Sequence, residues 1–91
     1  MKTYKLIVKG KVQGVGYRNY SKLLAADYSI NGTVRNQSNG DVMIIAQGSA
    51  ENLENYIKNL KVPQHRLMSI QDIEIEDYAS DKVYNNFKVI Y

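Results

Sequence analysis

The residues best suited to chemistry lie in a glycine-rich segment near the N-terminus, which runs Gly-Lys-Val-Gln-Gly-Val-Gly-Tyr-Arg from Gly10 to Arg18. Glycines permit backbone conformations in which several N–H groups point inward and surround an anion. The planar guanidinium of Arg18 can bind two oxygens of one oxyanion. If a helix begins near Arg18, its unpaired N-terminal N–H groups add to the site. The segment therefore favours binding of a phosphate-sized anion.

A second role for this segment stays open at this point. Glycine-rich turns between a strand and a helix often serve only as tight connections. The spacing of Gly10, Gly14 and Gly16 has little specificity by itself. The segment is also not a Walker A loop, because the Gly-Lys-Ser/Thr ending is missing.

Other polar residues give weaker signals. Asn36 precedes a predicted hairpin, where an asparagine commonly satisfies backbone groups. Arg35 is expected on the opposite side of the same strand, as surface charge. His65 is the only histidine, and it follows Pro63-Gln64 in a predicted loop. We expect His65 to be exposed to solvent rather than catalytic.

A strand and a helix are needed to position the glycine-rich segment, and the sequence predicts both. Tyr4, Leu6 and Val8 alternate with less apolar positions, which is typical of a strand with one buried face. The segment is followed by an amphipathic helix predicted over roughly residues 18–28. Its apolar face is formed by residues at three- and four-residue spacing: Tyr17, Tyr20, Leu24 and Tyr28.

The middle of the chain predicts a hairpin and a second helix. Strands are expected over 30–36 and 41–47, joined around an Asn-Gly pair at 39–40 whose residues both tolerate positive φ. Ser49 is a suitable N-cap for the second helix, and Pro63 ends it. The apolar face of this helix is expected to comprise Leu53, Tyr56, Ile57 and Leu60.

The last third of the chain predicts two further strands. One spans 68–76 with a bulge or bend near Gln71, because the apolar parity changes there. A short strand is expected over 87–91. The order β-α-β-β-α-β with an extra C-terminal strand predicts an α+β, ferredoxin-like sandwich. Two helices would pack on one face of a mostly antiparallel sheet.

Composition excludes several kinds of site. The 91 residues suit one domain, and their hydrophobic content of 44% argues against a disordered chain. The lack of cysteine excludes a disulfide scaffold, a thiolate zinc site and a thiol nucleophile. No apolar run approaches the ~20 residues of a membrane span, and no signal peptide is evident. We therefore expect a cytoplasmic protein that makes no membrane contact.

Charge is divided unevenly along the chain. Residues 1–40 carry a formal charge of +6 and residues 41–91 carry −3. A basic first half suits an anionic ligand, although lysines also keep small domains soluble.

The glycine-rich segment and a second motif together resemble the acylphosphatase family. The run Val12 to Arg18 resembles the family signature Val-Gln-Gly-Val-x-Phe-Arg. The run Asn31 to Asn36, followed by Gly40, resembles its second motif, Gly-x-Val-x-Asn with a downstream glycine. The aromatic, alternating C-terminus is also similar. The resemblance covers essentially the whole chain and implies one acylphosphatase-like domain over residues 1–91.

The resemblance implies hydrolysis of acyl phosphates to a carboxylate and inorganic phosphate, without metal or cofactor. Arg18 matches the phosphate-binding arginine and Asn36 the asparagine that orients the attacking water. Inorganic phosphate is then a product and competitive ligand, and a monomer is expected. The phosphate-binding loop would use the backbone amides of Gln13, Gly14, Val15, Gly16, Tyr17 and Arg18.

Two residues depart from the family pattern. Tyr17 replaces phenylalanine, and its hydroxyl must reach solvent or find a partner. Gly16 occupies a variable position that often holds a larger residue, so we expect a more flexible loop. Neither departure changes the proposed catalytic groups.

Two alternatives are a nucleic-acid-binding module and a small-ligand regulatory module of the same fold. RNA-recognition domains carry aromatics on their third strand, whereas residues 41–47 contain none. Most of the eight tyrosines also occupy core-facing spacings. We therefore expect no nucleic-acid partner. A regulatory module would leave the glycine-rich motif without a role.

Overall fold

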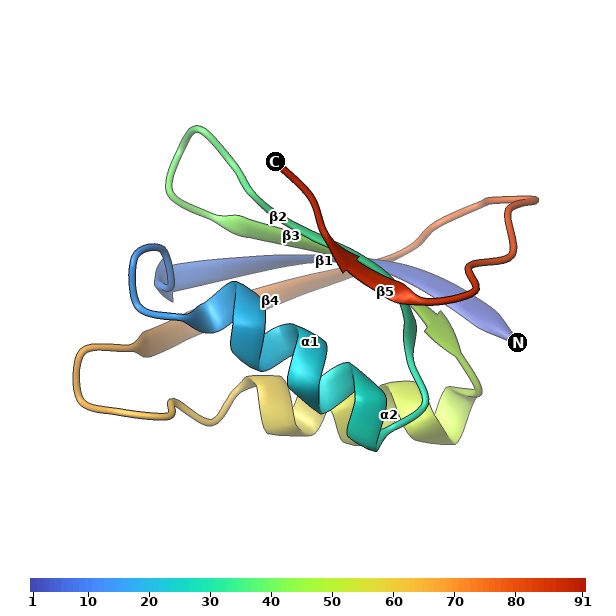
Figure 1. The fold of residues 1–91 in the computed structure, drawn as a ribbon, viewed down its shortest axis with the longest axis horizontal. Helices are drawn as coiled ribbons and strands as arrows, with labels where there is room; N and C mark the ends of the chain where they lie inside the picture. Colours follow the sequence, from blue (N-terminus) through green and yellow to red (C-terminus); the bar gives the residue numbers. More distant parts are fainter.

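The computed structural model describes residues 1–91, and its elements follow the order β-α-β-β-α-β-β along the chain (Figure 1). The elements are β1 (Lys2–Lys11), α1 (Tyr17–Asp27), β2 (Asn31–Asn36), β3 (Val42–Gly48), α2 (Ala50–Leu60), β4 (Ser69–Asp77) and β5 (Phe87–Val89). Neither helix is long and apolar enough to cross a membrane.

The strands form one five-stranded sheet in the order β4-β1-β3-β2-β5. Pairing is antiparallel except between β2 and β5, which are parallel. Both helices lie on the same side of this sheet (Figure 1). The predicted α+β, ferredoxin-like arrangement is therefore confirmed. The terminal strand, which the sequence left unplaced, lies at the edge beside β2.

The core lies between the sheet and the two helices. Leu6 and Val8 on β1 are fully buried, as their alternation predicts, and Val34 on β2 and Ile44 on β3 are fully buried too. They belong to a cluster of 18 buried apolar residues that includes the predicted face of α2. Burying an aliphatic side chain of this size contributes about 1.5–3 kcal/mol. The core thus holds β1 and α1 firmly at both ends of the glycine-rich loop between them.

Local boundaries agree closely with the sequence pattern. The Ser49 hydroxyl accepts a hydrogen bond from the Asn52 N–H at 3.0 Å, so Ser49 is the N-cap of α2. In the β1–β4 ladder, Lys9 pairs with Asp72 and Gly10 with Ile70. Gln71 is thereby left over, and the bulge predicted there is confirmed.

The hairpin predicted between β2 and β3 is confirmed, and its connection spans residues 37–41, one residue more than the predicted 37–40. Gly40 has a φ of 98°, whereas Asn39 does not adopt positive φ. The physical reason is hydrogen bonding within the longer turn. The Gln37 N–H donates to the Asp41 carbonyl, and the Asp41 N–H donates to the Asn39 side chain.

Candidate active site

The loop between β1 and α1 has the backbone geometry of an anion site. Gly14 and Gly16 have φ values of 73° and 86°, in the left-handed region that favours glycine. A Cβ at either position would meet no atom within 4 Å, so conformation rather than space requires glycine. Gly16 is also the N-cap of α1 and supplies no capping side chain, and the first turn contains no acidic residue. The backbone N–H groups at the start of α1 therefore donate no hydrogen bond to an N-cap side chain.

Arg18 lies in a surface pocket beside this loop. The pocket has a volume of about 410 Å³ and is lined by Gly14, Gly16, Arg18, Asn19, Lys22, Val89 and Tyr91. The guanidinium carbon lies 5.1 Å from the centre of the Tyr91 ring. The ion pairs of the protein join Lys5 to Glu76 and Lys9 to Asp41, so Arg18 has no carboxylate partner. An unpaired guanidinium next to a glycine loop is suited to receive a phosphate.

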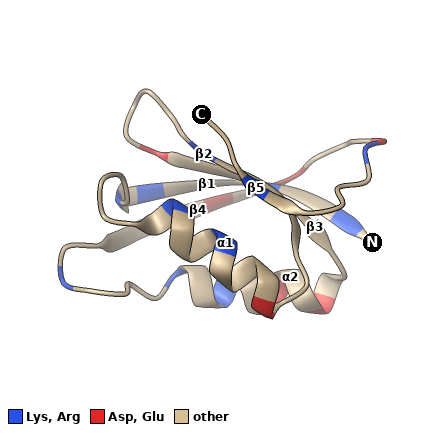
Figure 2. Cartoon of the chain, viewed as in Figure 1, with Lys and Arg blue, Asp and Glu red and all other residues tan.

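Two basic residues, Arg18 and Lys22, line this pocket. Figure 2 shows Lys and Arg on α1 and on β1, and Asp and Glu on β4 and at the C-terminal end of α1. Lys22 lies one turn after Arg18 on the same helix and lines the same pocket. Like charges four residues apart disfavour a helix slightly. An anion bound between them would remove that repulsion.

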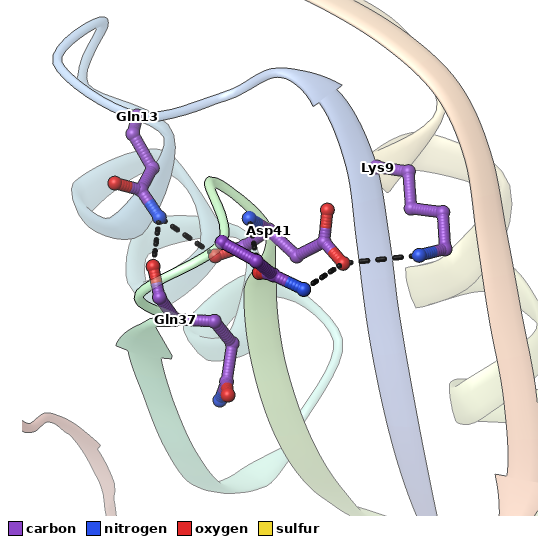
Figure 3. Close-up of polar contacts among 5 residues, drawn as sticks. Lys9, Gln13, Gln37 and Asp41 are labelled. Atoms are coloured by element: carbon purple, nitrogen blue, oxygen red, sulfur yellow. Dashed lines mark hydrogen bonds and ion pairs between the residues drawn. The ribbon is translucent and has the colours of Figure 1, made fainter.

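The Gln13 side chain ties the glycine-rich loop to the β2–β3 turn. Its amide nitrogen donates to the carbonyl oxygens of Gln37 at 2.7 Å and Asp41 at 2.8 Å (Figure 3). The Asp41 carboxylate in turn pairs with Lys9 of β1 at 3.0 Å, and this hydrogen bond raises the pKa of Lys9. Both N–H donors of the Gln13 side chain are therefore used within the protein, so only its backbone N–H is left to donate to an anion.

Asn36 ends β2 next to this tie. Alternate residues of a strand share a face, so Asn36 lies on the same face as the buried Val34, toward the helices. Its side-chain oxygen is buried and has no hydrogen-bond partner in the protein. Because Gln13 bonds to the neighbouring residue Gln37, Asn36 lies at the same end of the sheet as the loop. It is not, however, among the residues that line the Arg18 pocket.

The hydroxyl of Tyr17 finds a partner inside the protein. It donates to the carbonyl of Leu60, the last residue of α2, at 2.9 Å. The ring is 1% exposed, and burial raises the pKa of Tyr17. Tyrosine in place of phenylalanine at position 17 therefore links the start of α1 to the end of α2 through this hydrogen bond.

Two residues near the site were not predicted to take part in it. Tyr91 signalled only an alternating terminal strand, and nothing in the local pattern indicated its contact with Arg18. His65 is exposed as predicted, but its ring nitrogen lies 2.9 Å from the carbonyl oxygen of Val15 in the loop. Both contacts join residues far apart in the chain, so no spacing rule reveals them.

Comparison with known proteins gives one consistent result. The sequence profile of the family described as Acylphosphatase matches residues 4–89. A protein from Ligilactobacillus salivarius named Acylphosphatase is 43% identical over the full length of both chains. One from Oceanobacillus iheyensis, also named Acylphosphatase, is 35% identical over the full length of both. The crystal structure of acylphosphatase from Bacillus subtilis superposes with a TM-score of 0.90, at 30% identity and complete coverage of both chains.

Proposed function

Since the chain belongs to the acylphosphatase family of hydrolases, we propose that it hydrolyses the carboxyl–phosphate bond of acyl phosphates by direct attack of a positioned water. The observation that carries this proposal is the shared pocket of Gly14, Gly16 and Arg18. It joins left-handed glycines, a helix N-terminus without a side-chain cap and an unpaired guanidinium. These groups complement a phosphoryl group in shape and charge.

Arg18 and the loop amides of residues 13–18 bind the phosphoryl group and neutralise its charge in this mechanism. The acyl oxygen is a good leaving group, so the phosphorus needs no covalent attachment to the protein. The water oxygen bonds to phosphorus while the bond to the acyl oxygen breaks, and the carboxylate departs. Most of the rate then comes from position and charge stabilisation.

Asn36 orients the attacking water in this proposal. Its side-chain oxygen has no partner in the protein but is buried, so the side chain must turn toward the pocket before it accepts a hydrogen bond from that water. Its amide N–H₂ can then donate to an oxygen. An amide is too weak a base to remove the proton. A phosphoryl oxygen of the substrate takes that proton, so the products are the carboxylate and inorganic phosphate.

The mechanism requires no metal ion, which gives the first prediction. The protein should hydrolyse benzoyl phosphate at the same rate with added Mg²⁺ and with excess EDTA, followed by the absorbance change of the benzoyl group. Hydrolysis that stops with EDTA and returns with Mg²⁺ would contradict the metal-free mechanism. Absence of hydrolysis under both conditions would contradict the function itself.

We also propose that the protein acts as a monomer in the cytoplasm. The 18-residue core cluster draws on the sheet and both helices of one chain, which supports a fold that needs no second copy. Light scattering after gel filtration should give the mass of one chain, 10.4 kDa. Twice that mass would overturn the monomer, and cell fractionation tests the location.

A further inference from the structure

His65 lies outside the site described above, yet it contacts the glycine-rich loop. It belongs to the segment between α2 and β4, fifty residues away from the loop in sequence. Its Nε2 lies 2.9 Å from the carbonyl oxygen of Val15. Its other ring nitrogen, Nδ1, lies 3.2 Å from the backbone nitrogen of Leu67. Both ring nitrogens are therefore engaged by backbone groups.

The two contacts assign the tautomer of the neutral ring. A backbone N–H can only donate, so Nδ1 accepts from Leu67 and carries no proton. A carbonyl oxygen can only accept, so Nε2 carries the proton and donates it to Val15. The hydrogen bond from Leu67 thus fixes the His65 tautomer in which Nε2 donates to the loop.

A hydrogen bond at the Val15 carbonyl also sets the direction of the next N–H. The peptide between Val15 and Gly16 is trans and planar, so its C=O and N–H point in opposite directions. With the carbonyl held toward His65, the Gly16 N–H points away from His65. Gly16 itself lines the Arg18 pocket, and it is the N-cap of α1.

The Val15 side chain packs against the core, but His65 supplies the side-chain hydrogen bond to the Val15–Gly16 peptide. Its orientation depends on ψ of Val15 and φ of Gly16, and glycine tolerates both signs of φ at little cost. Gln13 holds the first part of the loop through the β2–β3 turn, but it does not contact this peptide. His65 is therefore the side chain that hydrogen-bonds this peptide and limits its rotation.

We propose that His65 is a positioning residue, which holds the Val15–Gly16 peptide so that the Gly16 N–H faces the phosphoryl group. This inference rests on the proposed function, because it assumes a phosphoryl group in the Arg18 pocket. His65 itself touches neither the substrate nor the water. Its loss should therefore weaken phosphate binding more than it slows the bound substrate.

Three substitutions of His65 distinguish the effect of its Nε2 hydrogen-bond donor from the effect of its side-chain volume. The amide nitrogen of glutamine reaches the place of Nε2, whereas that of asparagine reaches only the place of Nδ1. His65→Ala and His65→Asn should raise the KM for benzoyl phosphate and the inhibition constant of inorganic phosphate about three- to tenfold. His65→Gln should stay within about twofold of the wild type. In all three, kcat should change less than KM, and the melting temperature should stay nearly constant because His65 is exposed.

The Gly16 amide gives a direct readout that does not depend on activity. In ¹⁵N-labelled wild-type protein, its NMR signal should shift as inorganic phosphate is added, and the shift should be smaller in His65→Ala but retained in His65→Gln. Equal KM values in all variants, or an equal Gly16 response in the wild type and His65→Ala, would overturn the role of His65. A wild type that fails to hydrolyse benzoyl phosphate would instead overturn the proposed function. Phosphate-dependent shifts that respond to His65 would still support the positioning role in that case.

Discussion

At the scale of single residues, the contact between Arg18 and Tyr91 leaves the charge of the site available. The guanidinium carbon lies 5.1 Å from the ring centre and Arg18 has no carboxylate partner. An aromatic face attracts a cation without occupying its N–H groups. The contact with the exposed Tyr91 ring therefore leaves the hydrogen-bond donors of Arg18 free for a phosphate. A carboxylate in the same place would have competed with the substrate.

Gln13 gives the second prediction, because its side chain joins the loop to the β2–β3 turn. Gln13→Ala removes the two hydrogen bonds to backbone carbonyls, at 2.7 and 2.8 Å, that fix the loop beside Asn36. We expect kcat/KM for benzoyl phosphate to fall about tenfold, as one or two such bonds contribute roughly 1 kcal/mol each. Steady-state kinetics measure this loss.

Gln37→Ala is the matched control for that variant, because it keeps the backbone carbonyl that Gln13 uses. Its kcat/KM should remain within about twofold of the wild type. Equal losses in the two variants would show that the turn residues, and not the tie from Gln13, support the loop.

The roles proposed for Arg18, Asn36 and the loop amides come from the resemblance of two sequence motifs to the acylphosphatase family, and they stay predictions. The tie from Gln13, the ring of Tyr91 and the hydrogen bond from His65 were not predicted. Each of these joins segments 24 or more residues apart. Such contacts depend on how the strands and helices pack, which a single sequence leaves open.

At the scale of elements, tyrosine hydroxyls connect the two helices. Tyr17 donates to the carbonyl of Leu60 at 2.9 Å, and Tyr20 donates to the carbonyl of Asn59 at 3.0 Å. These carbonyls lie in the last turn of α2, where helices leave acceptors without partners. The Tyr17 hydroxyl satisfies the Leu60 carbonyl, and the Tyr20 hydroxyl adds a second donor to the Asn59 carbonyl, which also accepts from the Val62 N–H. Both hydrogen bonds hold the N-terminus of α1, where the proposed phosphate-binding amides lie.

The third prediction follows from the Tyr17 hydroxyl. Tyr17→Phe leaves the Leu60 carbonyl without its buried donor, so the free energy of unfolding should fall by about 1–2 kcal/mol. Urea unfolding followed by circular dichroism measures the change. Tyr78→Phe, at an exposed tyrosine, is the control and should change it by less than about 0.5 kcal/mol. An unchanged stability in Tyr17→Phe would mean that the hydrogen bond contributes nothing.

Periodicity predicted the helices and strands well, because alternating burial and helical spacing reflect one core. The turn after Asn36 is one residue longer than predicted, since side-chain hydrogen bonds around Asp41 include that residue in the turn. The parallel pairing of β5 with β2 could not be predicted from three residues, Phe87 to Val89. β5 pairs with β2 because the other strands leave β2 at an open edge of the sheet.

At the scale of the whole molecule, the core contains ionisable groups that must stay neutral. Burial raises the pKa of Tyr17 and of Tyr56 above the ordinary value of 10. Below pH 10 both tyrosines are neutral in the folded and in the unfolded chain. Above pH 10 the unfolded chain releases these protons and the folded chain retains them, so stability falls as pH rises.

The fourth prediction is this loss of stability in alkali. Urea unfolding should show a nearly constant contribution from these tyrosines up to about pH 9. Each should then cost about 1.2 kcal/mol of stability over the pH unit between pH 10.5 and 11.5. In Tyr17→Phe the slope should be smaller by the share of one group. An identical slope in the variant and the wild type would contradict the burial of a neutral Tyr17.

For the whole molecule we propose one division of roles: Arg18 holds the phosphoryl group, and Asn36 orients the water that attacks it. Benzoyl phosphate kinetics of Arg18→Ala and Asn36→Ala test this division most directly, with the exposed Arg35→Ala as the control. We expect Arg18→Ala to raise the KM and the inhibition constant of inorganic phosphate about 30-fold or more. Asn36→Ala should lower kcat about 100-fold with a KM within about threefold of the wild type. Wild-type KM in Arg18→Ala together with wild-type kcat in Asn36→Ala would contradict the account.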